Sequence, residues 1–189
     1  MLACRHRSLN SRWDCEFGSA SVATEIFLAD LDREIPISRR VLERFPEGKF
    51  DWKPHEKSMP MGYVAMMVAS MPEWLGMVIG MDELDIAPKD GPKFQPPPMK
   101  TAADFVKALD AAVDKGRAAL RGTNDTHLAT HWKLLAGGKV IQDTPRHIQI
   151  RDGVLSHWAH HRGQLSVYYK ILGVPVPSIY GPSGDEPPK

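Results

Sequence analysis

Four segments of this chain repeat apolar residues at three- and four-residue steps, and proline or glycine follows each of them. The segments extend over about Ala23 to Phe45, Met59 to Val78, Thr101 to Gly122 and Pro145 to Leu172. As helices, they would each carry one apolar face, and four such faces are buried most simply against one another. We therefore predict an all-α fold, a four-helix bundle.

The two ends of the chain lack this spacing. Residues 1–22 mix arginine, serine and isolated apolar side chains, which predicts a flexible N-terminal extension, and residues 23–189 form the predicted bundle domain. The proline-rich residues after Gly173 should form an extended C-terminal tail. Before the fourth segment, the sequence WKLLAGGKVIQ suits a short hairpin turning at Gly137 and Gly138. With 189 residues, 42% of them hydrophobic, we expect a single domain.

Charge and cysteine usage narrow the classes of partner and compartment. Lysine plus arginine number 24 and aspartate plus glutamate 23, so the chain has no positive excess to hold nucleic acid. The two cysteines, Cys4 and Cys15, match no zinc-binding spacing, and a reducing cytoplasm fits best. The sequence has no unbroken apolar run of about eighteen residues and no secretion signal, so we expect no membrane span and no export.

The strongest candidates for metal-binding side chains are His157 and His161 in the fourth segment. A four-residue step places both imidazoles on one helix face, where they can share a metal ion. The zinc-protease motif HExxH has this spacing, but its glutamate is replaced here by Trp158, which excludes that chemistry. The spacing alone is also compatible with two hydrogen-bonded histidines of the helix core.

A longer match surrounds this pair. The segment around it, HWAHHRGQLSVYYKILGVPVPSIYGPSGDE, resembles the terminal helix and tail of the DinB/YfiT-like family. The stretch FDWKPHEKSMPMGYVAMMVASMPEWLGMVIGMDELDI is similar to that family's connection into its second helix, and the resemblance covers about residues 23 to 186. It implies a four-helix bundle, often a homodimer, that holds a divalent metal such as zinc or nickel on three histidines.

By this resemblance, His157 and His161 would be two of the ligands, and the third position falls at Met67. A thioether is a soft ligand and a poor match for zinc or nickel in an imidazole site, so the expected triad is incomplete. His160 should point about 100° away from His161 around the helix, as a packing or hydrogen-bonding residue. The histidines that lie too far away or in a predicted connection are His55, His127, His131 and His147.

Several further residues are candidates for the wall of a pocket at this site, although ordinary core packing explains aromatic and methionine side chains at helical spacing equally well. Gln164 is also a candidate hydrogen-bond partner for a ligand or a metal-binding group. The candidates are Tyr63, Met67, Trp74, His160, Gln164 and Tyr168.

Two functions stay open at this point. One is a non-catalytic or weakly metal-binding dimeric protein of the stress-response or ligand-binding kind, with an unidentified small molecule as its ligand. The other is a metal-dependent enzyme, a thiol S-transferase, isomerase or hydrolase, in which His157 and His161 hold the ion. DNA binding, which the family's link to damage response suggests, is disfavoured by the balanced charge.

Overall fold

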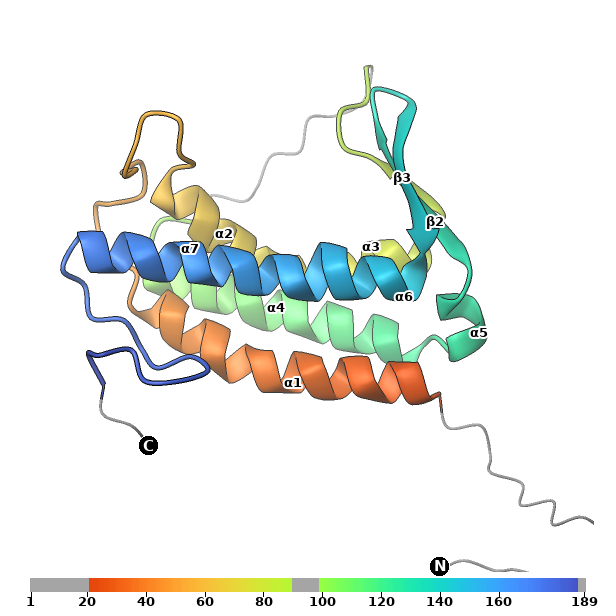
Figure 1. The fold of residues 1–189 in the computed structure, drawn as a ribbon, viewed down its shortest axis with the longest axis horizontal. Helices are drawn as coiled ribbons and strands as arrows, with labels where there is room; N and C mark the ends of the chain where they lie inside the picture. Colours follow the sequence, from red (N-terminus) through yellow and green to blue (C-terminus); the bar gives the residue numbers. More distant parts are fainter. Residues whose placement is uncertain (1–20, 90–98, 187–189) are drawn as a thin grey trace, which may run out of the picture.

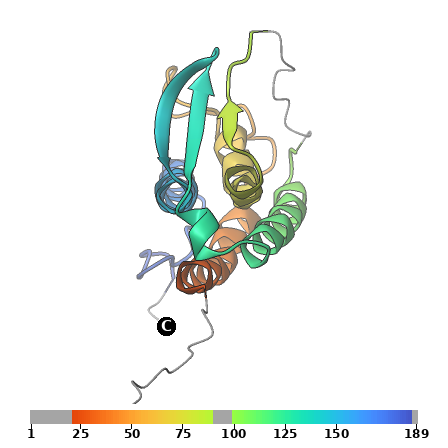
Figure 2. The ribbon, with the colours of Figure 1, turned by 90° about the vertical axis from the view of Figure 1, so that its right-hand side faces the viewer.

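Four helical stretches lie side by side along the length of the protein (Figures 1 and 2). The structure is a computed structural model that describes residues 21–89 and 99–186, so nearly all of the predicted N-terminal extension lies outside it. The stretches are α1 (Val22–Glu43); α2 (Met61–Ser70), continued by a 3-10 turn (Met71–Glu73) and α3 (Trp74–Gly80); α4 (Ala102–Arg121); and α6 (Arg146–Gln149), continued by a π-helical segment (Ile150–Ser156) and α7 (His157–Ile171).

The all-α prediction is wrong, because the described residues also contain a three-stranded sheet. Its strands are β1 (Glu83–Asp85), β2 (His131–Ala136) and β3 (Lys139–Pro145), with the short helix α5 (Asp125–Leu128) preceding β2. Strand β2 pairs parallel with β1 and antiparallel with β3. Gly137 and Gly138 turn between β2 and β3 with φ of 61° and 80°, so the predicted hairpin is confirmed. The sheet projects from one end of the helices (Figure 1).

Strand β1 was missed because its stabilising contacts are distant in sequence. The carboxylate of Asp85 accepts backbone hydrogen bonds from Gly137 and Gly138 at 3.0 and 2.7 Å, across more than fifty residues of chain. At the foot of the sheet, buried Arg146 donates to the carboxylate of Asp82 at 2.6 Å. Because β1 has only three residues and is stabilised by these distant contacts, it has no local sequence pattern from which a strand could be predicted.

Helix α4 begins and ends where the sequence predicts. Thr101 Oγ1 accepts the Asp104 amide hydrogen bond at 3.2 Å, and the Asp104 carboxylate accepts that of the Thr101 amide at 3.0 Å, forming a capping box. Gly122 follows the last turn. Inside the helix, Gly116 lies so close to the 3-10 turn that an added Cβ would be 2.4 Å from the carbonyl oxygen of Pro72.

Buried side chains from all four helical stretches form one core. Hydrogen bonds inside this core set how far each helix is shifted along its neighbour. Trp158 Nε1 donates to the carbonyl of Val68 at 2.7 Å, and the hydroxyl of Tyr169 donates to the carbonyl of Val41 at 2.9 Å. Burial raises the pKa of Tyr169 far above its ordinary value. The fully buried hydrophobic residues include Leu31, Leu42, Val64, Leu75, Phe105, Leu109, Ile150 and Leu165.

The residues Met61–Gly80 are long and apolar enough, with a mean hydropathy of 1.3, to match a membrane span by composition. In the structure 61% of that stretch is buried against the rest of the protein, as in the central helix of a globular core.

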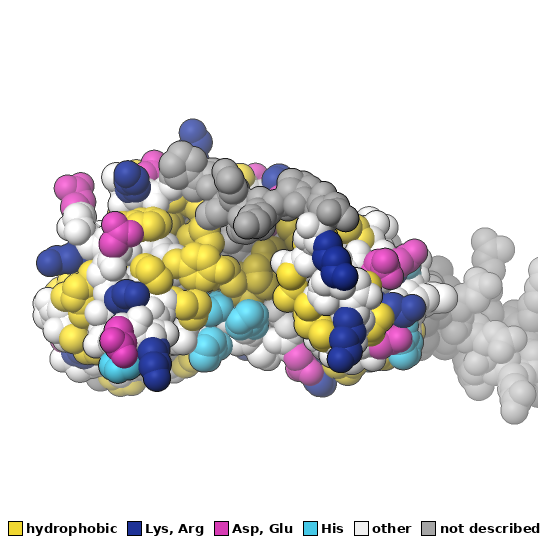
Figure 3. Space-filling model, turned by 90° about the horizontal axis from the view of Figure 1, so that it is seen from above, with side chains coloured by type: hydrophobic (Ala, Val, Ile, Leu, Met, Phe, Trp, Pro, Cys, Tyr) yellow, Lys and Arg dark blue, Asp and Glu magenta, His cyan; other side chains and the backbone are white. Residues whose placement is uncertain are grey.

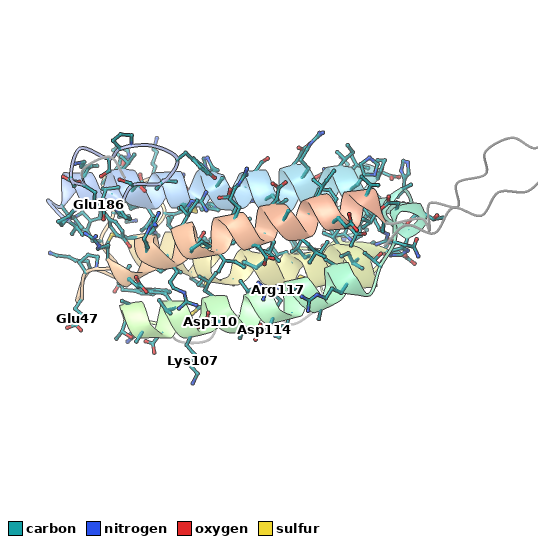
Figure 4. All side chains as sticks on the ribbon, turned by 90° about the horizontal axis from the view of Figure 1, so that it is seen from below. Glu47, Lys107, Asp110, Asp114, Arg117 and Glu186 are labelled. Atoms are coloured by element: carbon teal, nitrogen blue, oxygen red, sulfur yellow. The ribbon has the colours of Figure 1, made fainter. Side chains whose placement is uncertain are left out.

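Ion pairs join α1 to α4 on the lower face. Arg39 pairs with Asp110, and Arg117 pairs with Asp32 at 2.6 Å while approaching Asp114 at 3.9 Å. Figure 4 shows Asp110, Asp114 and Arg117 along α4 on this face. Such exposed pairs contribute at most about 1 kcal/mol each, so the core rather than this surface holds α1 in place.

The C-terminal tail packs back onto α1. Tyr180 donates to the Glu34 carboxylate at 2.6 Å, and the same carboxylate receives a hydrogen bond from Arg162. Arg162 and Glu34 are 1% and 6% exposed, so this is a buried ion pair. Further along, Glu186 pairs with Arg44 at 2.8 Å. The predicted extended tail instead folds back on itself, since the amides of Val176 and Ser178 donate to Asp185 and Glu186, both at 2.8 Å. Charged and polar contacts hold it against the first helix.

Candidate metal and ligand site

Three imidazoles gather on the first turns of α7. The ring centroids of His157 and His161 are 4.5 Å apart, those of His160 and His161 5.2 Å, and those of His157 and His160 6.2 Å. Steps of three and four residues along an α-helix produce this grouping. Figure 3 shows histidine side chains gathered beside hydrophobic surface, in a hollow between two projecting parts of the protein.

The backbone that leads into this cluster is unusual. The residues Ile150–Ser156 are π-helical, and such turns occur frequently beside functional sites because they alter the phase of the side chains that follow. Gly153 lies inside the segment, where an added Cβ would come within 2.2 Å of the side-chain nitrogen of Gln149. Gln149 is itself held by a 2.8 Å hydrogen bond from Gln142. The sequence predicted one continuous helix here and did not indicate this π-helical segment.

His161 is oriented by Gln164. The side chain of His161 is buried, and its Nδ1 lies 2.8 Å from Gln164 Oε1. An amide oxygen only accepts, so Nδ1 carries the proton and Nε2 keeps its lone pair. Across the described parts of the chain, Nε2 of His161 makes no hydrogen bond. The predicted role of Gln164 as a partner of a metal-binding group therefore has a matching contact.

Both histidines of the predicted pair are held in the neutral form. Burial is the main cause that lowers the pKa of His157 and of His161, and repulsion from neighbouring rings of the cluster acts in the same direction. Hydrogen bonds with the Gly153 backbone and with Gln164 oppose the shift without reversing it. A metal ion binds only the neutral imidazole ring. The lowered pKa values of His157 and His161 therefore favour the protonation state that can coordinate a metal.

Met67 lies on α2 opposite this part of α7. Trp158 contacts the carbonyl of Val68, and the Tyr168 hydroxyl contacts the carbonyl of Met59 at 3.2 Å, so α2 runs antiparallel to α7. Met67, one residue before Val68, is therefore level with the turn that carries the histidines, and its side chain is buried. Its assignment to the third metal position stays a prediction.

The three-histidine set that the resemblance implies does not fit this chain. Among residues 21–89 and 99–186, no three histidine, cysteine, aspartate or glutamate side chains are arranged to hold a metal ion as they stand. Met67 offers a thioether where zinc or nickel would take an imidazole.

The histidines outside the cluster are bonded elsewhere. The imidazole of His127 is 2.8 Å from the carbonyl of Ile79, and that of His147 is 3.0 Å from the carbonyl of Leu128. His131 pairs with Asp143 across the hairpin, and His55 accepts from the amide of Lys57 within its own loop. None of these contacts lies on α7, so these side chains do not complete the site.

The other pocket candidates divide into two groups. Trp74 meets the ring of His157 edge-on at 6.0 Å, so it lines the cluster from α3. Tyr63 is 41% exposed on α2. Tyr168 is buried against Trp52, with ring centroids 5.7 Å apart, and its hydroxyl is bonded to backbone, so it packs near the start of α2. Arg162, which directly follows the histidines in the sequence, is buried against α1.

Comparison with known proteins gives one family and one fold. A sequence model of the DinB family matches residues 24–188. A crystal structure of a DinB-like protein from Bacillus cereus ATCC 10987 superposes with a TM-score of 0.64 and 20% identity, covering 82% of this chain and 97% of that one. A DinB-like protein from Bacillus subtilis gives a TM-score of 0.58 and 15% identity, covering 80% and 95%. No protein with a curated description matches the sequence.

Proposed function

Since this chain belongs to the DinB family, we propose that it is a ligand-binding member whose His157 and His161 form a weak, exchangeable divalent-metal site rather than the family's complete one. The proposal rests on one observation: the ring centroids of His157 and His161 lie 4.5 Å apart, with the apolar ring of Trp74 edge-on to His157 at 6.0 Å. Two fixed imidazoles can share an ion, and the apolar wall beside them suits a small organic molecule.

The donor set supports weak binding. Met67, the residue predicted for the third metal position, is buried, and α2 (Met61–Ser70) contains no histidine, so α2 supplies no imidazole to the ion. Zinc sites with lasting occupancy use three or four nitrogen, sulfur or carboxylate ligands, and fewer protein ligands leave an ion that exchanges with solvent. An ion that exchanges readily with solvent suits a non-catalytic binding role better than sustained Lewis-acid catalysis.

The test is zinc titration by calorimetry, with metal content measured on protein purified without chelators or a histidine tag. We expect the unaltered chain to retain less than one ion and to take up zinc reversibly. The substitution His157→Ala should abolish uptake, and Met67→His should tighten it by restoring an imidazole opposite α7. Undiminished uptake in His157→Ala, or none in the unaltered chain, would overturn the proposal.

The second candidate is a metal-dependent enzyme, because an ion held by only two protein ligands has coordination positions left for reactants. An ion held by His157 and His161 keeps open positions that water or a small thiol could take. Steady turnover of a small thiol with an electrophile, dependent on added zinc and lost in His157→Ala, would establish that function instead.

A further inference from the structure

Two irregular backbone features, one in a strand and one in a helix, are joined by a pair of glutamine side chains. In the hairpin, the register between β2 and β3 shifts at Leu134 and Leu135, and Gln142 is the partner of Leu134 at this bulge. The Nε2 of Gln142 donates a 2.8 Å hydrogen bond to Oε1 of Gln149, the residue directly before the π-helical segment Ile150–Ser156. Bulges and π-turns both occur often beside functional sites, where they redirect side chains.

The amide group of Gln149 lies over Gly153, inside the π-helical segment. Its nitrogen, carbon and oxygen would be 2.2, 2.7 and 3.1 Å from a Cβ added to Gly153, so the amide fills the space that a side chain there would need. Gln149 is only 7% exposed, and the hydrogen bond from Gln142 fixes its amide in this place. Residue 153 must therefore be glycine as long as Gln149 keeps this conformation.

Gly153 in turn contacts the histidine cluster. The ring of His157, four residues further along, donates a hydrogen bond to the backbone carbonyl of Gly153. This bond keeps the proton on one ring nitrogen, and the direction of the ring depends on where the carbonyl lies. A chain of contacts thus leads from the hairpin to His157 through Gln142, Gln149 and Gly153.

The helix is anchored on either side of the π-helical segment. Before it, buried Arg146 donates to the carbonyl of Val78 and to the carboxylate of Asp82. After it, Trp158 donates to the carbonyl of Val68. Because both ends are fixed, a change between π-helical and α-helical turns cannot simply slide the helix along its axis. Such a change must rotate the residues between the anchors, and the last of these carries the first ring of the cluster.

We propose that Gln149 is a positioning residue for His157. Held in place by Gln142, it fixes the π-helical turn at Gly153, and a displacement of the hairpin therefore reorients the His157 ring. This inference goes beyond the proposed function, since it concerns the direction of a ring in the protein without added metal and holds whatever the site binds. The zinc titration tests the function separately.

Nitrogen NMR of the histidine rings, on chelator-treated protein at about pH 8 where the rings are neutral, tests the assignment. In the unaltered chain, the hydrogen-bonded ring of His157 should show one protonated and one unprotonated nitrogen. Gln142→Met and Gln149→Met keep the side-chain length but remove the bond between the glutamines. The proton should then be shared by both nitrogens of His157, and their signals should move toward each other, while those of His161 stay unchanged.

The two substitutions combined distinguish one shared contact from two separate effects. If both glutamines act through the same hydrogen bond, the double variant should change the His157 signals no more than either single variant does. The control is Asp143→Asn, which removes the charge of the exposed pair with His131 beside Gln142 and should leave His157 unchanged. Gln142 is half-buried on an edge strand, so Gln142→Met should fold even if the variants at the more deeply buried glutamine do not. Unchanged His157 signals in Gln142→Met, or additive changes in the double variant, would overturn the proposal.

Discussion

The indole nitrogen of Trp158 donates a hydrogen bond to the backbone carbonyl of Val68 across the buried contact between α7 and α2. Replacing Trp158 with phenylalanine removes the donor and leaves a buried carbonyl without it. An unsatisfied buried polar group costs about 1–3 kcal/mol, and the smaller ring adds a cavity. We expect the free energy of unfolding, measured by urea denaturation, to fall by about 2–4 kcal/mol.

Trp132 provides a matched control on β2. Its side chain is equally buried, but its indole nitrogen has no hydrogen-bond partner in the described part of the chain. Trp132→Phe therefore loses ring volume without breaking a hydrogen bond, and it removes an unsatisfied donor. It should cost clearly less than Trp158→Phe. Equal losses would show that the bond from Trp158 to Val68 contributes nothing measurable.

Arg162→Met should be among the most destabilising single changes in α7. It removes the buried cation that pairs with Glu34 and leaves that carboxylate with the exposed Arg33, 3.0 Å away, as its charge partner. Breaking a buried pair in this way costs about 3–5 kcal/mol. The control is Arg151→Met, since Arg151 pairs with Asp152 on the surface, where we expect a change of at most about 1 kcal/mol in urea denaturation.

Acid should weaken the attachment of the tail through Glu34. Burial alone would raise the pKa of Glu34, but hydrogen bonds from Tyr180 and Arg162 and the charge of Arg162 outweigh it, so the pKa lies below the ordinary 4.5. The unfolded chain therefore binds the proton more readily. The stability from this carboxylate is fully present above about pH 4.5 and is lost as pH falls through the lower, folded value.

Carbon NMR of the Glu34 carboxyl group would measure this pKa directly. Tyr180→Phe removes one hydrogen bond to the carboxylate, so the pKa should rise toward its ordinary value. Glu34→Gln should flatten the acid side of the stability curve over the same interval. A Glu34 pKa at or above 4.5 in the unaltered chain would contradict the prediction.

Gly116→Ala should destabilise the protein although alanine favours helices. The added methyl would lie 2.4 Å from the Pro72 carbonyl oxygen, which belongs to backbone and cannot move aside alone. Overpacking of this kind costs about 1–3 kcal/mol. At Gly76 on α3 the nearest atom to an added Cβ is 4.0 Å away, so Gly76→Ala should be stabilising by about 0.5–1 kcal/mol. Thermal unfolding of the two variants should shift in opposite directions.

Local signals explain what the sequence made predictable. The capping box of α4 joins Thr101 to Asp104, three residues apart, and the hairpin depends on two adjacent glycines. Both can be recognised within a short window of residues. The grouping of His157 with His161 likewise follows from a four-residue step, and their rings do lie close together. Whether they bind metal stays a prediction.

The missed features depend on partners far along the chain or on side-chain direction. Strand β1 is held through Asp85 by residues of the hairpin, and Arg162 is buried because Glu34 lies opposite it on α1. The direction of His160 around the helix stays a prediction, because side-chain torsions decide where the ring lies. The apolar residues of the segment Ile150–Ser156 repeat as in an ordinary α-helix, so its π-helical geometry could not be predicted from the sequence.

The attachment of the tail to α1 also constrains the order in which the chain can fold. The contact between Tyr180 and Glu34 spans 146 residues, and that between Arg162 and Ser38 spans 124. Contacts of such separation form late, after the cost of closing a long loop has been met. During synthesis α1 is made well before Arg162 and Tyr180, so its buried carboxylate gains these partners only after more than a hundred further residues have been added. A chain shortened before Tyr180 should therefore show its defect in the first helix.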